Sequence, residues 1–424
     1  MKTMETPVLA GWAATEITPN IPCRMGGYGS RAAWANAVHD PLYAHALALG
    51  TPERPFVVIA CDLIGVDETM VEETRRNVAQ PHPGAATWLG ATHTHSGPDV
   101  ARSLSFSSDP PDPAIKKLVI RGAESAAREA ITRMHPVWAR HVSGPISGVA
   151  TNRDHPEQAA DITLDLLCFY NAPEQAQPAA VFGSFPCHPT VMSADNLAIS
   201  ADLPGAFRRQ LRALLGGDTW IALATGAAGD ISTRHTRQRQ GFDELERLGA
   251  LLAQQAWKLF PAGQPLSLAS PDIREAVVSF EPKAPFSPEE LAANERRIQE
   301  RMSAEQQVGN IAQARTLETA LQGIQAAPKL VRAEQPRNIT VSVALMGKLA
   351  LVAVPGELYN RLGAVIKQTT NHFVLLLGYT NGYVGYIPSR EAYAELDYEV
   401  LISPFAPGSG ERLAQTVQQL LRDV

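Results

Sequence analysis

Two histidines one residue apart stand directly after an apolar run and directly before a Ser-Gly-Pro turn, in the stretch TWLGATHTHSGPD at 87–99. Residues i and i+2 of a strand point to the same side, so His93 and His95 would project together if the strand continues through them. At a strand end they could instead diverge, with one binding a metal and the other facing a substrate. Neutral imidazole is a common zinc ligand, so the pair indicates a metal site, with an ordinary loop pair as the alternative.

A zinc site needs further ligands, and two other segments offer them. His188, in VFGSFPCHPTVMSAD, again follows an apolar run and precedes a proline, although a histidine in that position can simply end a strand. Glu357, in VPGELYNRLG, follows the apolar run LALVAV where a helix is expected to begin. A helix N-terminus favours a carboxylate whether or not a metal is present, so Glu357 is a weaker signal by itself.

Two loops rich in small or aromatic residues complete the candidates. The segment NGYVGYIPSREAYAELDYEV carries Tyr383, Tyr386, Tyr393 and Tyr398, which could equally form a hydrophobic loop with hydroxyls at its rim. The loop LATGAAGDISTRHTR contains Ser232 among glycines that permit close approach of a ligand. It matches neither the G-x-S-x-G nucleophile elbow nor the phosphate-binding G-x-x-x-x-G-K pattern.

Composition limits the classes of partner. The chain has 424 residues, 45% of them hydrophobic, with 37 Lys and Arg against 43 Asp and Glu. A net charge of −6 gives no electrostatic reason to bind nucleic acid or an anionic membrane surface. The four cysteines form no CxxC pair, and no segment approaches the roughly 20 apolar residues of a membrane span. We therefore expect reduced thiols, a cytoplasmic protein and no stable association with membranes.

Apolar runs rich in β-branched residues alternate with amphipathic segments, which predicts an α/β or mixed α+β fold with central mixed sheets covered by helices. Helices are predicted at 67–80, 114–134 and 200–217, the last with Pro204 early and Gly216 late, as helix ends prefer. The predicted strands lie at 55–66, 162–170, 179–185, 220–225, 339–347 and 349–354.

The segment 284–332 differs in composition from the rest of the chain. It is dense in good helix formers and poor in large apolar residues, so it is predicted to be a helical hairpin inserted on the outside of a single domain spanning 1–424. Such a hairpin could be a lid, scaffolding, or an arm that joins copies of the chain into a homo-oligomer.

These segments together resemble the neutral ceramidase family, the zinc amidases that cleave N-acylsphingosine. The resemblance runs in the family's order along nearly the whole chain. It rests on the segments MGGYGSR, VHDPLYAHALAL, ATHTHSGP, TNRD, FPCHPTVM, GAAGDIS, VPGE and NGYVGYIPSREAYAELDYE.

The resemblance implies the fold of the family's N-terminal catalytic domain, an amide-hydrolysing activity that uses a metal-activated water, and one Zn²⁺ per chain. By position, it implies the zinc ligands His93, His188, Glu357 and Tyr386. It also implies the residues that surround the scissile amide, which are His95, Arg153, Ser232 and Tyr398. Of the two histidines in HTH, the first would then hold the metal and the second would act as proton carrier. Ser232 could orient the water or attack directly.

Two departures from the family bear on the substrate. Thr233 and Arg234 follow the serine where the family usually has Pro and Asn, and we expect neither the family's secretion signal nor its C-terminal β-sandwich domain. A small soluble amide, lactam or ester is therefore expected in place of membrane ceramide.

Other interpretations stay open. The chain could be a true ceramidase, an esterase on the same scaffold, or a non-catalytic binding protein for a metal or ligand. A two-metal hydrolase is disfavoured because Asp99 falls two places too late for an H-x-H-x-D motif.

Overall fold

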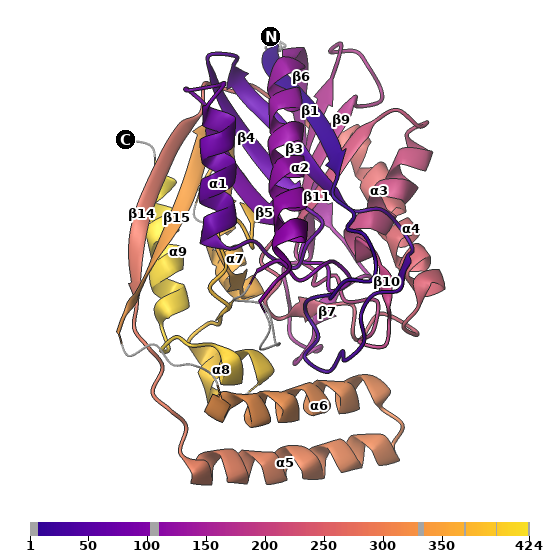
Figure 1. The fold of residues 1–424 in the computed structure, drawn as a ribbon, viewed down its shortest axis with the longest axis vertical. Helices are drawn as coiled ribbons and strands as arrows, with labels where there is room; N and C mark the ends of the chain where they lie inside the picture. The colour runs from indigo at the N-terminus through magenta and orange to yellow at the C-terminus, as the bar shows by residue number, and fades with distance from the viewer. Residues whose placement is uncertain (1–6, 102–109, 330–334, 369, 396, 423–424) are drawn as a thin grey trace.

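The computed structural model of the chain describes residues 7–101, 110–329, 335–368, 370–395 and 397–422. In this part of the chain, nine strands form the larger of two main sheets (Figure 1). In spatial order they are β11 (Trp220–Thr225), β9 (Ala180–Phe185), β8 (Thr163–Tyr170), β6 (His135–Pro145), β1 (Val8–Glu16), β3 (Tyr43–Thr51), β4 (Arg54–Cys61) and β5 (Ala86–Ala91), with β13 (Gln264–Leu266) beside β6.

The larger sheet is mixed. β4 and β5 pair in parallel, as do β9 and β11, whereas the other neighbours are antiparallel. A parallel pair requires a crossover. Helix α1 (Glu68–Ala79) provides it between β4 and β5, and α3 (Asp202–Leu214) provides it between β9 and β11.

A smaller sheet packs against one face of the larger one. Its order is β14 (Asp272–Phe280), β15 (Arg337–Met346), β16 (Leu349–Ala353) and β18 (Phe373–Leu377), with β16 and β18 parallel and α7 (Asn360–Gln368) between them in sequence. Alternate residues of both sheets share one core, which includes Phe56, Phe182 and Leu351. Several strands, among them β4, β9 and β16, are therefore buried and apolar on both faces, as their sequences indicate.

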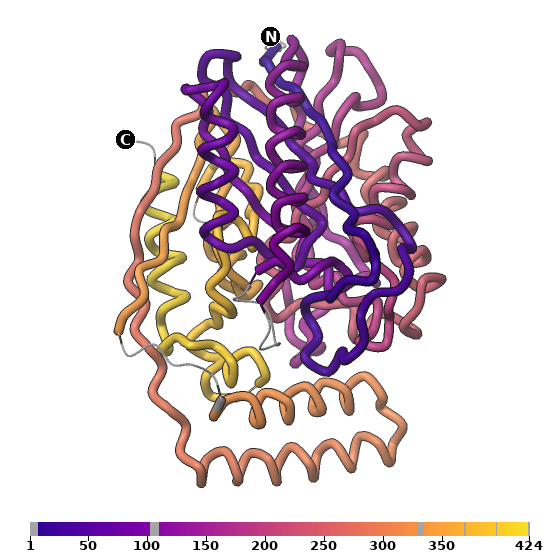
Figure 2. The backbone as a smooth tube through the Cα atoms, in the orientation of Figure 1, coloured from indigo at the N-terminus to yellow at the C-terminus, as the bar shows by residue number. Residues whose placement is uncertain are grey.

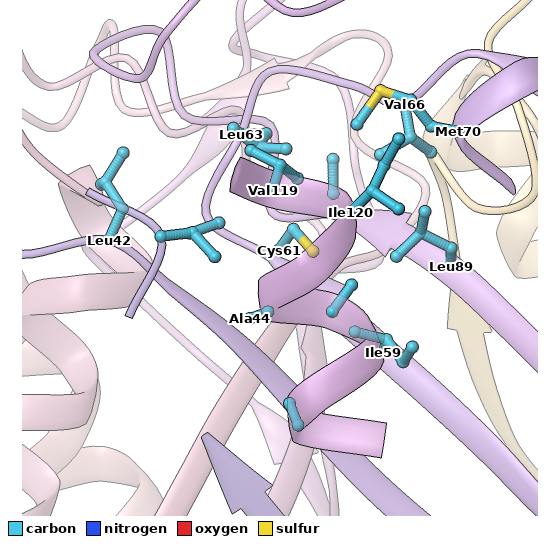
Figure 3. Packing of buried hydrophobic residues seen from close by; sticks show 14 of the residues in the cluster. Leu42, Ala44, Ile59, Cys61, Leu63, Val66, Met70, Leu89, Val119 and Ile120 are labelled. Atoms are coloured by element: carbon cyan, nitrogen blue, oxygen red, sulfur yellow. The ribbon is translucent and has the colours of Figure 1, made fainter. Parts of the chain in front are cut away.

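Helices cover the outer faces. Helices α1 and α2 (Pro113–Thr132) pack over β3, β4 and β5, where Cys61, Leu89 and Val119 belong to one buried cluster (Figure 3). Helices α3 and α4 (Phe242–Leu259) cover β8, β9 and β11, and α7 and α9 (Ser409–Leu420) cover the smaller sheet. The order of layers, helices, larger sheet, smaller sheet and helices, confirms the predicted α/β class. Helices α1, α2 and α3 confirm the helices predicted at 67–80, 114–134 and 200–217.

Local chemistry explains where these helices begin. The Asp67 side chain accepts a hydrogen bond from the Met70 amide, and Asp112 caps α2 through the Ala114 amide with Pro113 in the first turn. The four cysteines are buried and free, in agreement with the expected thiols.

The predicted hairpin is present between the neighbouring strands β14 and β15. Helix α5 (Pro288–Gln307) begins at a capping box on Ser287, and α6 (Ile311–Ala326) returns beside it, between α5 and the rest of the molecule (Figures 1 and 2). Residues 330–332, the end of the predicted insertion, lie outside the described residues. A small core that contains Ile298, Leu317 and Leu401 joins the hairpin to the short helix α8 (Tyr398–Ile402).

The remaining elements are short. They are β2 (Ala37–Val38), β7 (Thr151–Asn152), β10 (Ala198–Ile199), β12 (Ile231–Ser232), β17 (Glu357–Leu358), β19 (Tyr386–Ile387), and the 3₁₀ turns at Phe260–Ala262, Ala327–Lys329 and Glu391–Ala394. Among the helices that the structure describes, none combines the length and apolar composition needed to cross a membrane.

Candidate metal centre

The predicted site residues follow the carboxyl ends of parallel strands. His93 and His95 come directly after β5, His188 after β9, and Glu357 after β16. Strands β5 and β11 lie at opposite ends of the strand order, yet their carboxyl ends meet. The contact is shown by the hydrogen bond that Thr225 Oγ1 donates to the Thr92 carbonyl at 2.6 Å. Carboxyl ends of parallel strands are where α/β folds place ligands, and here strands from two sheets supply one site.

Two buried imidazoles face each other at the centre of the site. His93 and His188 are 1% and 0% exposed, and their Nε2 atoms lie 3.1 Å apart. The Nδ1 of His93 lies 2.6 Å from the Ile64 carbonyl, and that of His188 lies 2.5 Å from the Ala228 carbonyl. A carbonyl only accepts, so each Nδ1 carries a hydrogen, and Nε2 is the nitrogen that each ring can offer to a metal ion.

The Glu357 carboxylate completes this arrangement. Its Oε2 atom lies 2.9 Å from His188 Nε2 and 3.3 Å from His93 Nε2, and its side chain is buried. Burial, together with the charge of Arg153, lowers the pKa of His188 to about 4, so its Nε2 is unprotonated at neutral pH. Two imidazole nitrogens and a carboxylate facing one another in a buried site form a donor set that could hold a cation.

The separations of these atoms fit a tetrahedral zinc ion. Ligand atoms about 2.0–2.1 Å from a tetrahedral zinc lie about 3.3 Å from one another. The observed separations of 2.9, 3.1 and 3.3 Å are close to that value. The donor set of imidazole nitrogen and carboxylate oxygen is also one that zinc accepts.

Tyr386 lies beside this set because β17 and β19 are parallel partners, with Glu357 opposite Tyr386 in the register. The Tyr386 hydroxyl lies 3.5 Å from His188 Nε2. Two further tyrosines hold the carboxylate: the Tyr383 hydroxyl donates to Glu357 Oε1, and the Tyr379 hydroxyl donates to Oε2 at 3.4 Å. Tyr379 also stacks on the His93 ring, at 3.9 Å between centroids.

His95 approaches the centre from another side. Its Nε2 lies 3.3 Å from His93 Nε2, and the ligand atoms of His93, His95 and His188 all lie within 4.8 Å of one another. Its Nδ1 is buried and has no hydrogen-bond partner among the described residues. The ring packs edge-on against Tyr28, and Gly27, at φ 97°, leaves no room for a Cβ beside it. Burial lowers the pKa of His95 well below its usual value.

Arg153 contacts the centre through Tyr386. Its Nε donates to Glu399 Oε1 at 2.5 Å, and one Nη2 hydrogen bond of 3.1 Å reaches the Tyr386 hydroxyl. Glu399 is fully buried, and its charge raises the pKa of Arg153 well above the usual value despite the opposing effect of burial. The structure shows no bond at Arg153 Nη1 to any described residue, so that amino group is available to a ligand.

Ser232 and Tyr398 occupy the rim of the same centre. Ser232 pairs with Thr151 across β12 and β7 and forms a parallel bridge with His188, so the backbone fixes it next to a central imidazole. Tyr398 begins α8, and its ring lies 6.1 Å from that of Tyr386. Burial raises the pKa of the Tyr398 phenol, which keeps the hydroxyl protonated and able to donate.

The structure thus brings all of the predicted site residues into one cluster, while their individual roles stay predictions. Sequence reasoning missed Glu399 and Tyr379 and assigned no role to Tyr383. Glu399 adjoins Tyr398 in a segment that the sequence had marked, but only the fold shows that it contacts Arg153, which lies 246 positions away.

Comparison with known proteins gives a consistent picture. No protein-family model matches the chain. Neutral ceramidase from Pseudomonas aeruginosa is 22% identical to it, in an alignment that covers 94% of this chain and 70% of that protein. The crystal structure of neutral ceramidase from P. aeruginosa matches with a TM-score of 0.77 at 20% identity, covering 98% of this chain and 74% of the other. A ceramidase complexed with C2 matches with a TM-score of 0.76 at the same identity and coverage. The chain is therefore related to neutral ceramidase over nearly its whole length and shares its fold.

Proposed function

We propose that this chain is a zinc-dependent amidase that hydrolyses a carbon–nitrogen bond, other than a peptide bond, in a small soluble amide or lactam. The observation that carries the proposal is the convergence of two buried imidazoles, each with its Nδ1 held by a backbone carbonyl, and a carboxylate. His93, His188, Glu357 and Tyr386 would hold one zinc ion. Bound there, zinc would lower the pKa of a water to about 7 and polarise the scissile carbonyl.

The other residues supply what an amide needs beyond a metal. An amine leaves only when its nitrogen is protonated, and His95 beside the centre is the group placed to transfer that proton. Arg153 Nη1 and the Tyr398 hydroxyl have no partner among the described residues and would donate to the developing oxyanion. Glu399 holds the guanidinium of Arg153 in position through their buried ion pair.

Metal analysis and a substrate panel test this function together. The purified protein should contain about one equivalent of zinc, because a single convergent donor set is present among the described residues. Removal of the metal by chelation should abolish turnover, and added zinc should restore it. Two equivalents of metal would support the two-metal alternative instead.

The panel should span N-acyl amino acids, cyclic amides, simple esters and ceramides. We expect turnover of a compact amide and little turnover of long-chain ceramide. Ceramide is the second candidate because the relatives carry the name ceramidase. If long-chain ceramide in detergent micelles gave the highest kcat/KM, the small-substrate assignment would be wrong. Turnover of esters alone would make the protein an esterase.

A separate prediction concerns Ser232, which is 2% exposed and whose Oγ accepts a hydrogen bond from the Arg234 amide at 3.2 Å. If the hydroxyl only orients the attacking water, Ser232→Ala should lower kcat by about 10- to 100-fold and leave measurable turnover. Intact-protein mass spectrometry during turnover should then find no acyl-enzyme. Detection of a covalent adduct on Ser232 would establish a serine nucleophile and contradict the water mechanism.

A further inference from the structure

Arg234 is a half-buried arginine without an acidic partner. Its Nη1 donates to Thr316 Oγ1 at 3.2 Å and its Nη2 to Thr319 Oγ1 at 3.4 Å, both on α6. No carboxylate of the described residues lies within ion-pair distance of its guanidinium. The two long bonds to neutral hydroxyls hold the group in place and leave its charge unbalanced.

The two arginines that are almost completely buried near the site, Arg208 and Arg153, are each paired with a carboxylate. Arg208 forms two hydrogen bonds with the Asp62 carboxylate, at 2.9 and 2.6 Å, and Arg153 is paired with Glu399. Burial and the neighbouring charge of Arg153 lower the pKa of Arg234 to about 10, so it stays a cation at neutral pH. Keeping a charge partly buried without a counter-ion costs stability, and such a cost is commonly met at a ligand site.

Arg234 lies next to the candidate metal centre. Its amide contacts Ser232, and Thr316, which accepts from its guanidinium, donates to the Arg153 carbonyl at 2.9 Å. Helix α6 therefore closes the site on this side, close to α8 in Figure 1. The guanidinium of Arg234 thus lies between α6 and the loop that carries Ser232, on the side of the site where Arg153 lies.

Two further cations lie on the same side. Arg237 donates to the Thr190 carbonyl at 2.6 Å, and Arg31 donates only to backbone carbonyls, including that of His95. Neither forms an ion pair with a described residue. Arg31, Arg234 and Arg237 all act electrostatically on the phenol of Tyr28, whose ring packs against His95.

The acidic groups near this region are occupied or too distant to neutralise it. Asp202 accepts hydrogen bonds from the amides of Val191, Met192 and Leu203. Asp154 and Glu399 act on Arg234 electrostatically, but neither forms an ion pair with it, and Glu399 is paired with Arg153. Beyond the Glu357 carboxylate at the centre, this side of the site therefore carries three arginines, Arg31, Arg234 and Arg237, for which the described residues provide no ion-paired carboxylate.

We infer that Arg234, supported by Arg237, binds an oxyanion carried by the substrate, either a carboxylate or a phosphate. This inference rests on the proposed amidase function and narrows its substrate class to acylated amines that bear a negative charge near the scissile amide. A planar guanidinium suits such a group because it can donate two parallel hydrogen bonds to it.

Matched substrates test the inference. N-acylglycine carries a carboxylate, N-acylglycinamide is its neutral counterpart, and N-acylphosphoethanolamine carries a phosphate. The wild-type zinc enzyme should prefer an anionic substrate over the neutral one by at least about tenfold in kcat/KM. Whichever anion is preferred identifies the group that Arg234 binds.

Arg234→Met should remove that preference, lowering kcat/KM for the anionic substrate by about 30- to 100-fold and for the neutral one by less than about threefold. Arg234→Lys should retain an intermediate preference for the anionic substrate, because lysine keeps the positive charge but cannot donate two parallel hydrogen bonds. Arg297→Met, which removes an exposed arginine from α5, is the matched control. It should leave kcat/KM unchanged for both the anionic and the neutral substrate. Equal losses for both substrates in Arg234→Met would show a structural role and overturn the inference.

A binding measurement separates this inference from the proposed function. Calorimetry with succinate as a non-cleavable probe should show binding to the zinc-loaded wild-type protein and at least tenfold weaker binding to Arg234→Met. Unchanged succinate affinity in that variant would contradict the anion site. If no amide is hydrolysed while the Arg234-dependent binding persists, the amidase function is wrong and the anion site stands.

Discussion

His188→Ala should yield a folded protein that contains almost no zinc and has lost at least about a thousandfold in kcat/KM. His188 lies at the centre of the donor set: its Nε2 is 3.1 Å from His93 Nε2, 2.9 Å from Glu357 Oε2 and 3.5 Å from the Tyr386 hydroxyl. Removing it leaves the other donors without the arrangement that a single ion requires. Metal content by mass spectrometry and turnover of the best amide from the panel give the two measurements.

His188 is a better test than His93 because of the backbone. His93 has φ 66°, a left-handed conformation that carries strain for most residues, so His93→Ala changes local strain as well as ligation. His82→Ala is the matched control, since His82 lies in the turn before β5, at the end of the strand opposite to His93. A His188→Ala protein that retained one tightly bound zinc would refute the assignment of this residue as a ligand.

The chemistry of the candidate site could be predicted from local sequence because each key residue follows an apolar strand. His93, His188 and Glu357 all stand a few positions after strands β5, β9 and β16, where a parallel sheet presents its ligands. Sequence alone left each of these signals ambiguous, because a histidine or glutamate after a strand also has structural uses. No single one of these residues indicated zinc. The zinc site was predicted because all of them appear together, in the order found in a known family.

The contacts between distant segments could not be predicted. The carboxyl ends of β5 and β11 meet although the two strands lie at opposite ends of the strand order. Glu357 meets Tyr386 because they follow β16 and β18, which are parallel neighbours in the smaller sheet. Glu399 and Tyr379 act through contacts with residues far away in sequence, and such contacts leave no periodic or compositional signal. A helical hairpin was predictable from its helix formers, whereas its position against Arg234 followed only from the structure.

The division of roles between His93 and His95 is open to direct measurement. His95 Nε2 lies 3.3 Å from His93 Nε2, so its imidazole is close enough to be a third nitrogen ligand. The surroundings of His95 nevertheless favour the role of proton carrier over that of metal ligand. His93 and His188 each have Nδ1 fixed by a carbonyl, the usual support of a ligating histidine, whereas His95 Nδ1 has no partner among the described residues. A ring with one unfixed nitrogen can exchange its proton, as a proton carrier must.

We therefore expect His95→Ala to keep about one equivalent of zinc and to lose on the order of 10²- to 10⁴-fold in kcat, the usual contribution of a general acid or base. Added imidazole should restore part of the activity of this variant, a rescue that a purely structural role would not give. His141→Ala is the control, because His141 Nδ1 also has no hydrogen-bond partner among the described residues, but its ring packs on Phe373, away from the candidate centre. If His95→Ala came out free of metal, then His93, His95 and His188 would together be the ligands. The proton on the leaving nitrogen would then have to come from another group, and the Tyr398 hydroxyl would be the first to examine.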